Sequence, residues 1–334
     1  MIVTLTLNPS LDRTLELPQL LRGEVLRTAA PVVEPGGKGV NVVRALSAHG
    51  VPALAVLPVA GPEGEELARL LAESEVPVRL VPVSGRSRTN TAVIEADGTV
   101  TKLNEPGPEL AAADLEAVVD VLLGAVRAGD WVVLSGSLPP AVDGLDLAAV
   151  IRRATAHGAL VAVDSSDAAL EAAVAAAPRI VKPNREELST LVGAPLGTLR
   201  EVIAAADRVR ESGVERVLVS LGADGAVLVG PGEPIVGACS VAIVRSTVGA
   251  GDCLLAGYLA AITRGADESA ALLEGLSWGA AAAATPATGI PTPEATASAD
   301  VRLVWRPDLD RPLAAATPPN PPHTAPIRHR TKEY

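Results

Sequence analysis

A glycine-rich turn that ends in a carboxylate is the segment of the sequence most suited to chemistry. Residues 246–252 read Ser-Thr-Val-Gly-Ala-Gly-Asp and stand between a predicted strand and a helix that we expect to begin near Gly251. Glycines admit a ligand close to the backbone, and the free N–H groups at the start of a helix converge on an anion. Asp252 could accept the proton of an attacking hydroxyl while these N–H groups stabilise a moving phosphoryl group. The pattern indicates phosphoryl transfer, and its alternative is a helix cap by Asp252 that contributes about 1 kcal/mol.

A second glycine-rich turn, residues 35–41 (Pro-Gly-Gly-Lys-Gly-Val-Asn), also precedes a predicted helix. By the same reasoning its backbone could hold a phosphate or a sugar hydroxyl. The plainer alternative is a tight strand-to-helix connection, since paired glycines are common turn residues. Neither turn is a Walker loop, because Gly39 follows Lys38 where a hydroxyl residue is required. Neither is a dinucleotide fingerprint, because no glycine follows Gly251 at the required spacing, and the protein-kinase motifs are absent.

Polar and basic side chains near the first strand and on a predicted small sheet could face the same cleft. They are Asn8, Asp12, Arg27, Arg86, Arg88 and Asn90. The forked guanidinium of arginine matches the geometry of a phosphate. Three arginines on short segments of an acidic chain indicate an anionic substrate, and a solvated, charged edge strand is the alternative.

Two further strand ends lie in the second half of the chain. Residues 181–187 end a strand and open a helix, which places Asn184 and Glu187 one turn apart. Both could act on the water shell of a magnesium ion, and a capping box explains them equally well. Residues 220–225 (Ser-Leu-Gly-Ala-Asp-Gly) leave another strand at the position where an open α/β sheet is expected to bind a nucleotide.

Composition excludes several classes of protein. The 334 residues carry a net charge of −11, which works against nucleic-acid and anionic membrane partners. Five aromatic residues, with no Phe, cannot build base-stacking platforms in quantity. Two cysteines make neither a disulfide framework nor a four-ligand zinc site, and no long apolar segment or basic leader is present. We therefore expect a cytoplasmic protein, with structural roles for the four histidines.

Short β-branched runs alternate with helical patterns along most of the chain. This alternation predicts an α/β fold with a doubly wound, mostly parallel sheet and helices on both faces. The expected strands of this sheet are 2–7, 53–59, 78–82, 131–135, 160–164, 180–182 and 217–221, with further strands at 226–229 and 241–245. The expected helices are 38–48, 63–74, 111–126, 145–156, 185–192, 199–212, 251–263 and 268–284.

Four predicted strands lack intervening helices, at 11–17, 24–33, 89–95 and 100–103. They predict a separate small sheet, contributed by about 11–34 and 86–105, that covers the cleft as a lid and pairs with a second subunit in a homodimer. We expect one domain over 1–305. Residues 306–334 hold seven prolines and predict a disordered tail, whose removal after about Arg311 should leave activity intact.

In this order and on these elements the motifs resemble the ribokinase/PfkB family of sugar kinases. The resemblance runs from Thr4 to about Pro293 and rests on residues 6–12, 35–42, 86–90, 135–139, 164–166, 182–188, 220–226 and 246–252. It implies the ribokinase-like fold. Residues 102–108 and the turn around Lys38 are most similar to bacterial members that use ATP and magnesium to convert fructose 1-phosphate to fructose 1,6-bisphosphate.

The resemblance also implies a role for individual residues. Asp252 would be the general base, with an anion hole from Gly249, Ala250 and Gly251. The sugar phosphate would be held by Asp12, Arg27, Gly37, Lys38, Asn41, Arg88, Asn90 and Ser137. ATP would be bound by Lys182, Asn184, Ser220, Gly222, Ala223 and Gly225. Magnesium would be ordered by Asn184 and Glu187, and a potassium ion by carbonyls near Ser246 and Val248.

Three alternatives remain at this point. Tagatose 6-phosphate and fructose 6-phosphate carry a phosphate at one end and a hydroxyl at the other, as fructose 1-phosphate does. A non-catalytic sugar-phosphate sensor would keep the fold without turnover.

One departure from the family is Cys253, which follows the proposed base at a helix N-terminus. That position should lower the pKa of its thiol, so we expect slow inactivation by thiol reagents, slowed further by ATP.

Overall fold

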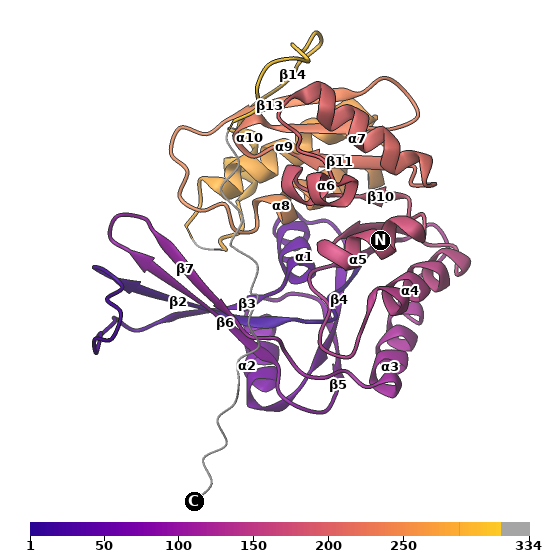
Figure 1. Ribbon diagram of the computed structural model, residues 1–334. Coiled ribbons are helices and arrows are strands. Elements are labelled where there is room, and N and C mark those ends of the chain that lie inside the picture. The colour runs from indigo at the N-terminus through magenta and orange to yellow at the C-terminus, as the bar shows by residue number, and fades with distance from the viewer. Residues whose placement is uncertain (287, 315–334) are drawn as a thin grey trace, which may run out of the picture.

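The computed structural model describes residues 1–286 and 288–314. Its centre is a ten-stranded sheet in the order β14-β13-β12-β11-β10-β9-β8-β1-β4-β5 (Figure 1). The seven strands from β11 to β5 are mutually parallel, and β12, β13 and β14 add antiparallel pairs at one side. The strands are β1 Ile2–Leu5, β4 Ala53–Val59, β5 Val78–Pro82, β8 Trp131–Ser135, β9 Leu160–Asp164, β10 Ile180–Val181, β11 Arg216–Ser220, β12 Ala226–Val229, β13 Ile235–Ser240 and β14 Asp300–Leu303. The predicted mostly parallel α/β sheet is confirmed.

Helices cover both faces of this sheet. They are α1 Lys38–Ala48, α2 Gly61–Glu73, α3 Ala112–Leu123, α4 Gly144–Ala156, α5 Asp167–Ala175, α6 Arg185–Val192, α7 Leu199–Glu211, α8 Ala250–Thr263, α9 Glu268–Ala283 and α10 Pro293–Ala297, with a short 3-10 turn η1 Gly222–Asp224. Apolar residues of α3 to α7 form one core cluster, and those of α1, α2, α8 and α9 form the other. Because successive strand residues point to opposite faces, Val3 joins the first cluster and Ile2 the second. The uninterrupted apolar runs of the sequence follow from this two-sided burial.

A separate four-stranded sheet, which we call the small sheet, extends to one side of the main body (Figure 1). Its order is β3-β2-β6-β7, with β2 Ser10–Leu17, β3 Val32–Gly36, β6 Arg88–Glu95 and β7 Val100–Asn104. Three predicted strands are confirmed. The fourth, 24–33, is wrong for most of its length, because β3 begins only at Val32 and residues 24–31 pair with no strand. The apolar residues that suggested a strand there, such as Val25, are exposed and have no neighbouring strand to pair with.

The second error concerns residues 241–245, which form no strand. The chain pairs earlier instead, through β13, and Ile243 and Val244 are then exposed on the connection to α8. The predictions omitted α5, α10 and β14. An Ala-rich helix such as α5 carries few large apolar residues, so its periodicity is weak.

The Pro-rich segment predicted from residue 306 begins as an ordered part of the protein. Leu309 O accepts a hydrogen bond from Arg200 N at 2.9 Å, and Leu313 N donates to Gly197 O at 2.8 Å. Leu313 is buried in the core cluster of α3 to α7. The predicted disordered tail therefore starts too early, and residues 315–334 lie outside the described part of the chain.

Helix ends follow the local sequence. His49 and His157 are C-terminal caps of α1 and α4, which are structural roles. His49 also stacks on Trp278 with ring centroids 3.7 Å apart. Within residues 1–286 and 288–314, no helix is both long enough and apolar enough to cross a membrane.

We predict that Gly257→Ala lowers the free energy of unfolding by about 1–3 kcal/mol, because overpacking a close helix contact forces backbone shifts. A Cβ at Gly257 on α8 would lie 2.8 Å from Trp278 Cγ and 2.9 Å from Glu274 O on α9. Urea unfolding measures the loss. Gly232→Ala is the matched control, since a Cβ there meets nothing within 4 Å, and equal stability of the two variants would contradict the packing argument.

Candidate active site

Charged groups from three parts of the fold meet at the carboxyl ends of the central strands. Lys38 opens α1, Asp164 ends β9, and Lys182 directly follows β10. Lys38 Nζ lies 2.7 Å from Asp164 Oδ1, and Lys182 Nζ lies 3.1 Å from Asp164 Oδ2. Asp164 is fully buried and Lys182 is 4% exposed. One carboxylate thus holds two ammonium groups in fixed positions at the edge of the sheet.

The electrostatics of this trio are mutual. Burial alone would raise the pKa of Asp164, but Lys182 and Lys38 outweigh it and hold that pKa below its usual value. Burial likewise opposes the charge of Lys38, but Asp164, Glu187 and Asp252 outweigh it and raise the pKa of Lys38. Asp164 and Lys38 are therefore both charged at neutral pH.

Asp252 lies in the first turn of α8 and is 6% exposed. Its Oδ2 accepts a hydrogen bond from Asn41 Nδ2 at 2.9 Å. The side chain caps no backbone N–H of α8, whose N-cap is Gly249, so the helix-cap alternative is wrong. Burial first, and repulsion by Asp164 second, raise the pKa of Asp252 to about 6, against the opposing effects of Lys38 and Asn41. A carboxylate with a pKa near working pH is suited to accept a proton.

The glycine turn before Asp252 has the backbone freedom and the neighbours of an anion site. Gly249 adopts φ 78°, a left-handed conformation that favours glycine. A Cβ at Gly251 would lie 3.2 Å from Lys182 Nζ, so the ammonium group stands directly against the first turn of α8. The positive end of the helix and the Lys182 charge therefore act on the same point.

Polar side chains of the small sheet form a second group. Asp12 on β2 is paired in register with Asn90 on β6. Asp12 Oδ1 accepts hydrogen bonds from Ser10 Oγ at 2.7 Å and from Asn90 Nδ2 at 3.2 Å. The Asp12 carboxylate fills the space that a Cβ of Gly36 would need, so it lies against the turn that opens α1. Arg88 Nε donates to Asn8 O at 3.1 Å.

Not every predicted substrate residue joins these groups. Arg27 is exposed on the connection between β2 and β3. Arg86 pairs with Glu63 on α2, at an exposed position. Ser137 is exposed, and its Oγ is 3.4 Å from Asn8 Nδ2. Of the three arginines, only Arg88 is hydrogen-bonded to the segment that follows β1, through Asn8 O.

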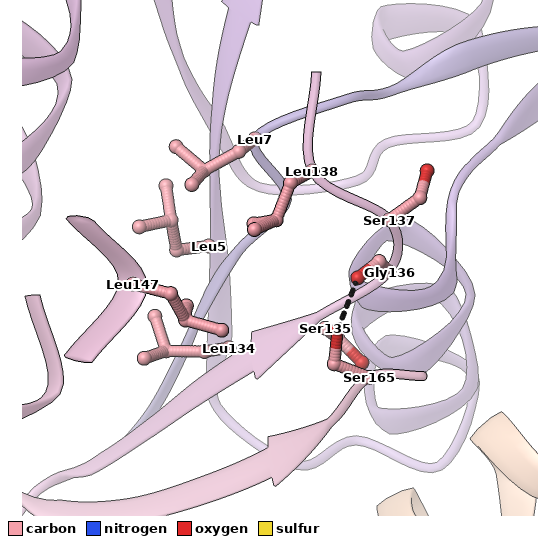
Figure 2. Close-up of a pocket in the computed structure, with 9 residues that line it drawn as sticks. All are labelled: Leu5, Leu7, Leu134, Ser135, Gly136, Ser137, Leu138, Leu147 and Ser165. Carbon is pink, nitrogen blue, oxygen red and sulfur yellow. Dashed lines mark hydrogen bonds between the residues drawn. The ribbon is translucent and has the colours of Figure 1, made fainter. Parts of the chain in front are cut away.

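A small cavity of about 10 Å³, room for about one water molecule, lies behind the turn at Gly136 (Figure 2). Leucines from β1, β8 and α4 line it, and Ser165 Oγ donates to Gly136 O at 2.9 Å. Figure 2 shows the Ser137 hydroxyl pointing away from these leucines. This cavity is too small for a sugar and belongs to the packing beneath the site.

The predicted nucleotide residues lie at two neighbouring strand ends. Asn184 and Glu187 form a capping box at the start of α6, in which Glu187 N donates to Asn184 Oδ1 and Asn184 N donates to Glu187 Oε2, each at 2.8 Å. The other Glu187 oxygen is 3.9 Å from Lys38 Nζ, and burial raises the pKa of Glu187. Asn184 also bridges in parallel to Ser220, which precedes η1. The capping alternative is confirmed, and it leaves one Glu187 oxygen facing the site.

The η1 turn has a constrained backbone. Gly222 and Gly225 adopt φ 59° and 91°, and a Cβ at Gly225 would overlap Gly237 O. Ala223 lies between them on the exposed side. Near the other turn, Ser246 Oγ accepts from Val248 N at 3.2 Å. In residues 1–286 and 288–314, no group of three or more His, Cys, Asp or Glu side chains is arranged to hold a metal ion.

The prediction that the helix N-terminus lowers the pKa of the Cys253 thiol is wrong. The side chain is 1% exposed and packs in the core cluster of α1, α2, α8 and α9. Burial, and then the Asp252 charge, raise the pKa of the thiol. These two effects on the pKa outweigh the opposite effect expected from the helix N-terminus, because the side chain at this position is buried in the core.

Asp164 is the site residue that the sequence predictions missed as a functional side chain. The available signal was its position: a carboxylate that ends an otherwise apolar predicted strand. A charge at the carboxyl end of a parallel strand faces the ligand-binding edge.

A buried carboxylate, a glycine turn at a helix N-terminus and two ammonium groups held by Asp164 form an arrangement suited to phosphoryl transfer. The sequence pattern described as pfkB family carbohydrate kinase matches residues 6–295. A Rhodobacter capsulatus protein named 1-phosphofructokinase is 39% identical over 307 residues, covering 89% of this chain and 95% of the relative. The ATP-dependent 6-phosphofructokinase isozyme 2 of Escherichia coli strain K12 is 40% identical over 284 residues, covering 84% and 90%.

A solved structure is similar in three dimensions as well. Phosphofructokinase-2 from Escherichia coli in complex with potassium superposes with a TM-score of 0.85 at 36% identity, covering 89% of this chain and 96% of that one. The chain belongs to the pfkB family of carbohydrate kinases. It is therefore a kinase with the ribokinase-like fold, and kinases of this family use ATP.

We predict that an aromatic disulfide reagent labels Cys239 in the native protein and spares Cys253, since Cys239 is half-buried and Cys253 is fully covered. Release of the chromophore should reach about one equivalent per chain, and the second equivalent should appear only in denaturant. Cys239→Ser should abolish the native reaction. Rapid native labelling of Cys253 would contradict the buried placement.

Proposed function

We propose that this kinase transfers the γ-phosphoryl group of ATP to fructose 1-phosphate and produces fructose 1,6-bisphosphate. The observation that carries the proposal is Asp252, buried in the first turn of α8, bonded to Asn41 and adjacent to the glycine backbone of residues 249–251. The Rhodobacter capsulatus relative named 1-phosphofructokinase supports the choice of sugar phosphate.

Asp252 is proposed as the general base. It takes the proton of the sugar hydroxyl as that oxygen bonds to the γ-phosphorus and the bond between the γ-phosphorus and the ADP oxygen breaks. The backbone N–H groups of Gly249, Ala250 and Gly251 stabilise the charge on the moving phosphoryl oxygens, and Lys182 Nζ beside Gly251 adds to this field. Asn41 holds the carboxylate in the orientation that this proton transfer needs.

The small sheet and the α1 turn are proposed to hold the sugar phosphate. Asp12 and Asn90, joined through Ser10, present hydrogen-bonding groups for sugar hydroxyls. Arg88 offers a guanidinium for the phosphate, Arg27 is proposed to approach it when the small sheet closes, and Ser137 is exposed at the rim. Gly37 and Lys38 open α1 toward the same ligand.

The nucleotide is proposed to lie over the ends of β10 and β11, with Lys182, Asn184, Ser220, Gly222, Ala223 and Gly225 around it. The donor set fits magnesium held largely by the nucleotide phosphates and water, because only Glu187 and Asn184 offer oxygens there and both are partly engaged in the capping box. When bound, magnesium would neutralise charge on the phosphates. Potassium is proposed beside Ser246 and Val248, and the Escherichia coli phosphofructokinase-2 structure described as a complex with potassium supports it.

We also propose a homodimer that pairs through the small sheet, with residues 1–305 as the kinase domain, and a cytoplasmic location in keeping with two free cysteines. The exposed Val32, Val100 and Leu103 on strands of the small sheet support pairing at that surface.

A second candidate substrate is fructose 6-phosphate, because the Escherichia coli relative named 6-phosphofructokinase isozyme 2 is as similar as the 1-phosphofructokinases. Tagatose 6-phosphate has the same pattern of phosphate and hydroxyl. A non-catalytic sensor is disfavoured, since a pure binder has no use for a buried base.

We predict that, in an ADP-release assay with ATP and magnesium, kcat/KM is higher for fructose 1-phosphate than for fructose 6-phosphate, tagatose 6-phosphate or free fructose. Asp252→Asn should lower kcat by about two orders of magnitude or more, because the base is lost while its shape is kept. Thermal unfolding of the variant is the control for folding. Preference for another sugar phosphate would keep the mechanism and change the substrate, whereas no turnover on any of them would overturn the proposal.

We predict that kcat/KM falls as the pH drops through about 6, since Asp252 accepts a proton only when ionised and its pKa is raised to about 6. Asp164→Asn should move this acid limb to lower pH, because the carboxylate that repels the Asp252 charge is gone. Glu187→Gln is the control and should keep the limb in place, since glutamine preserves the capping box. An unchanged limb in Asp164→Asn would contradict the assignment of the limb to Asp252.

A further inference from the structure

Residues 304–314 continue beyond β14 and pair with β13 and with residues 197–200 at the start of α7 instead of leaving the protein. Val304 N donates to Val236 O at 2.8 Å, Arg200 N donates to Leu309 O, and Pro312 bridges to Thr198. Leu313 is 9% exposed and inserts into the core beside this helix. The segment is therefore anchored by backbone pairing and by an apolar side chain. We call residues 308–314 the C-terminal strap.

The end of the strap contacts the η1 turn through both oxygens of the Asp224 carboxylate. Arg311 NH2 lies 2.8 Å from Asp224 Oδ1, and Ala314 N donates to Asp224 Oδ2 at 2.6 Å. The Asp224 side chain is 8% exposed, so both of its oxygens are satisfied by the strap in a largely water-excluded place. A buried carboxylate that loses such partners is strongly disfavoured.

The strap also reaches the neighbouring element. Ala314 O accepts a hydrogen bond from Arg185 NH1 at 2.8 Å, and Arg185 is the first residue of α6, directly after Asn184. One short segment thus joins the η1 turn to the start of α6. These are the two elements between which the proposed function places the nucleotide.

The η1 turn needs such support because its own bonds are few. It closes through Leu221 N to Gly225 O at 2.8 Å and two bonds of 3.1 Å, and two glycines with positive φ give it many backbone alternatives. A partner that fixes Asp224 reduces these alternatives before any ligand binds. Preorganisation of this kind raises affinity without touching the ligand.

We propose that the C-terminal strap preorganises the η1 turn for the nucleotide, with Arg311 and Asp224 as positioning residues. The proposal rests on the proposed function in that it takes the nucleotide to bind at this turn. The strap touches none of Asp12, Asn90 or Asp252, so it acts on the nucleotide and leaves the sugar phosphate and the proton transfer alone.

Two measurements test the strap. The first is amide hydrogen exchange without any nucleotide, in which Arg311→Ala should speed exchange at residues 221–226. The second is calorimetric binding of a non-hydrolysable ATP analogue with magnesium, in which Arg311→Ala should weaken affinity by about five- to tenfold, the scale of one coupled polar contact. In steady-state assays KM for ATP should rise by a similar factor while kcat and KM for the sugar phosphate stay unchanged. Arg311→Lys should recover part of the loss.

The matched control is Arg200→Ala, which removes an exposed ion pair to Asp310 on the same strap without touching η1. A chain ending at residue 314 keeps the strap contacts described above and should behave as the full chain, whereas a chain ending at residue 310 should lose nucleotide affinity at least as much as Arg311→Ala. Unchanged exchange and affinity in Arg311→Ala, or equal weakening for both substrates, would overturn the strap proposal. Failure of the full chain to bind the nucleotide analogue would instead overturn the proposal that a nucleotide binds at the η1 turn, on which the affinity prediction depends. Faster exchange in Arg311→Ala would then show that the strap orders the η1 turn, but not for a nucleotide.

Discussion

The buried carboxylate of Asp164 is the group on which the arrangement of the site depends. It binds Lys38 from the start of α1 and Lys182 from the end of β10, two elements far apart in the sequence. A fully buried carboxylate is disfavoured unless it is paired, so moving either lysine away from Asp164 would cost free energy. Such networks contribute little net stability, since the charges must be taken out of water. Their benefit here is position: each ammonium group is fixed before a ligand arrives.

The same charge shapes the chemistry of its neighbour. Asp164 repels the Asp252 carboxylate, while Lys38, Lys182 and Asn41 favour its ionised form. Burial adds the largest effect and brings the pKa of Asp252 close to neutrality. Two carboxylates in one water-excluded place therefore take different roles, one as a permanent anion and one as a group that can exchange a proton.

Local patterns in the sequence predicted the elements, while long-range packing decided what individual side chains do. The bounds of α1 and α6 follow from glycine turns, a capping box and apolar periodicity, all of which are local. The prediction for Cys253 came from its helix position, but its side chain is buried in the apolar cluster shared by α1, α2, α8 and α9, which no local pattern records. Residues 24–31 and 241–245 are apolar enough for strands and find no partner strand. Asp164 carried a local signal, as a carboxylate that ends an apolar strand, but only the fold brings it together with Lys38 and Lys182.

The place of β1 in the sheet has a consequence for biosynthesis. This strand is synthesised before both of its neighbours, β4 and β8, which begin at Ala53 and Trp131. The two pairings of β1 therefore cannot both form until Trp131 has been synthesised, and each joins strands separated by a long stretch of chain. Until then an apolar strand with both edges unpaired is open to other chains, which makes the early nascent chain a natural client for chaperones.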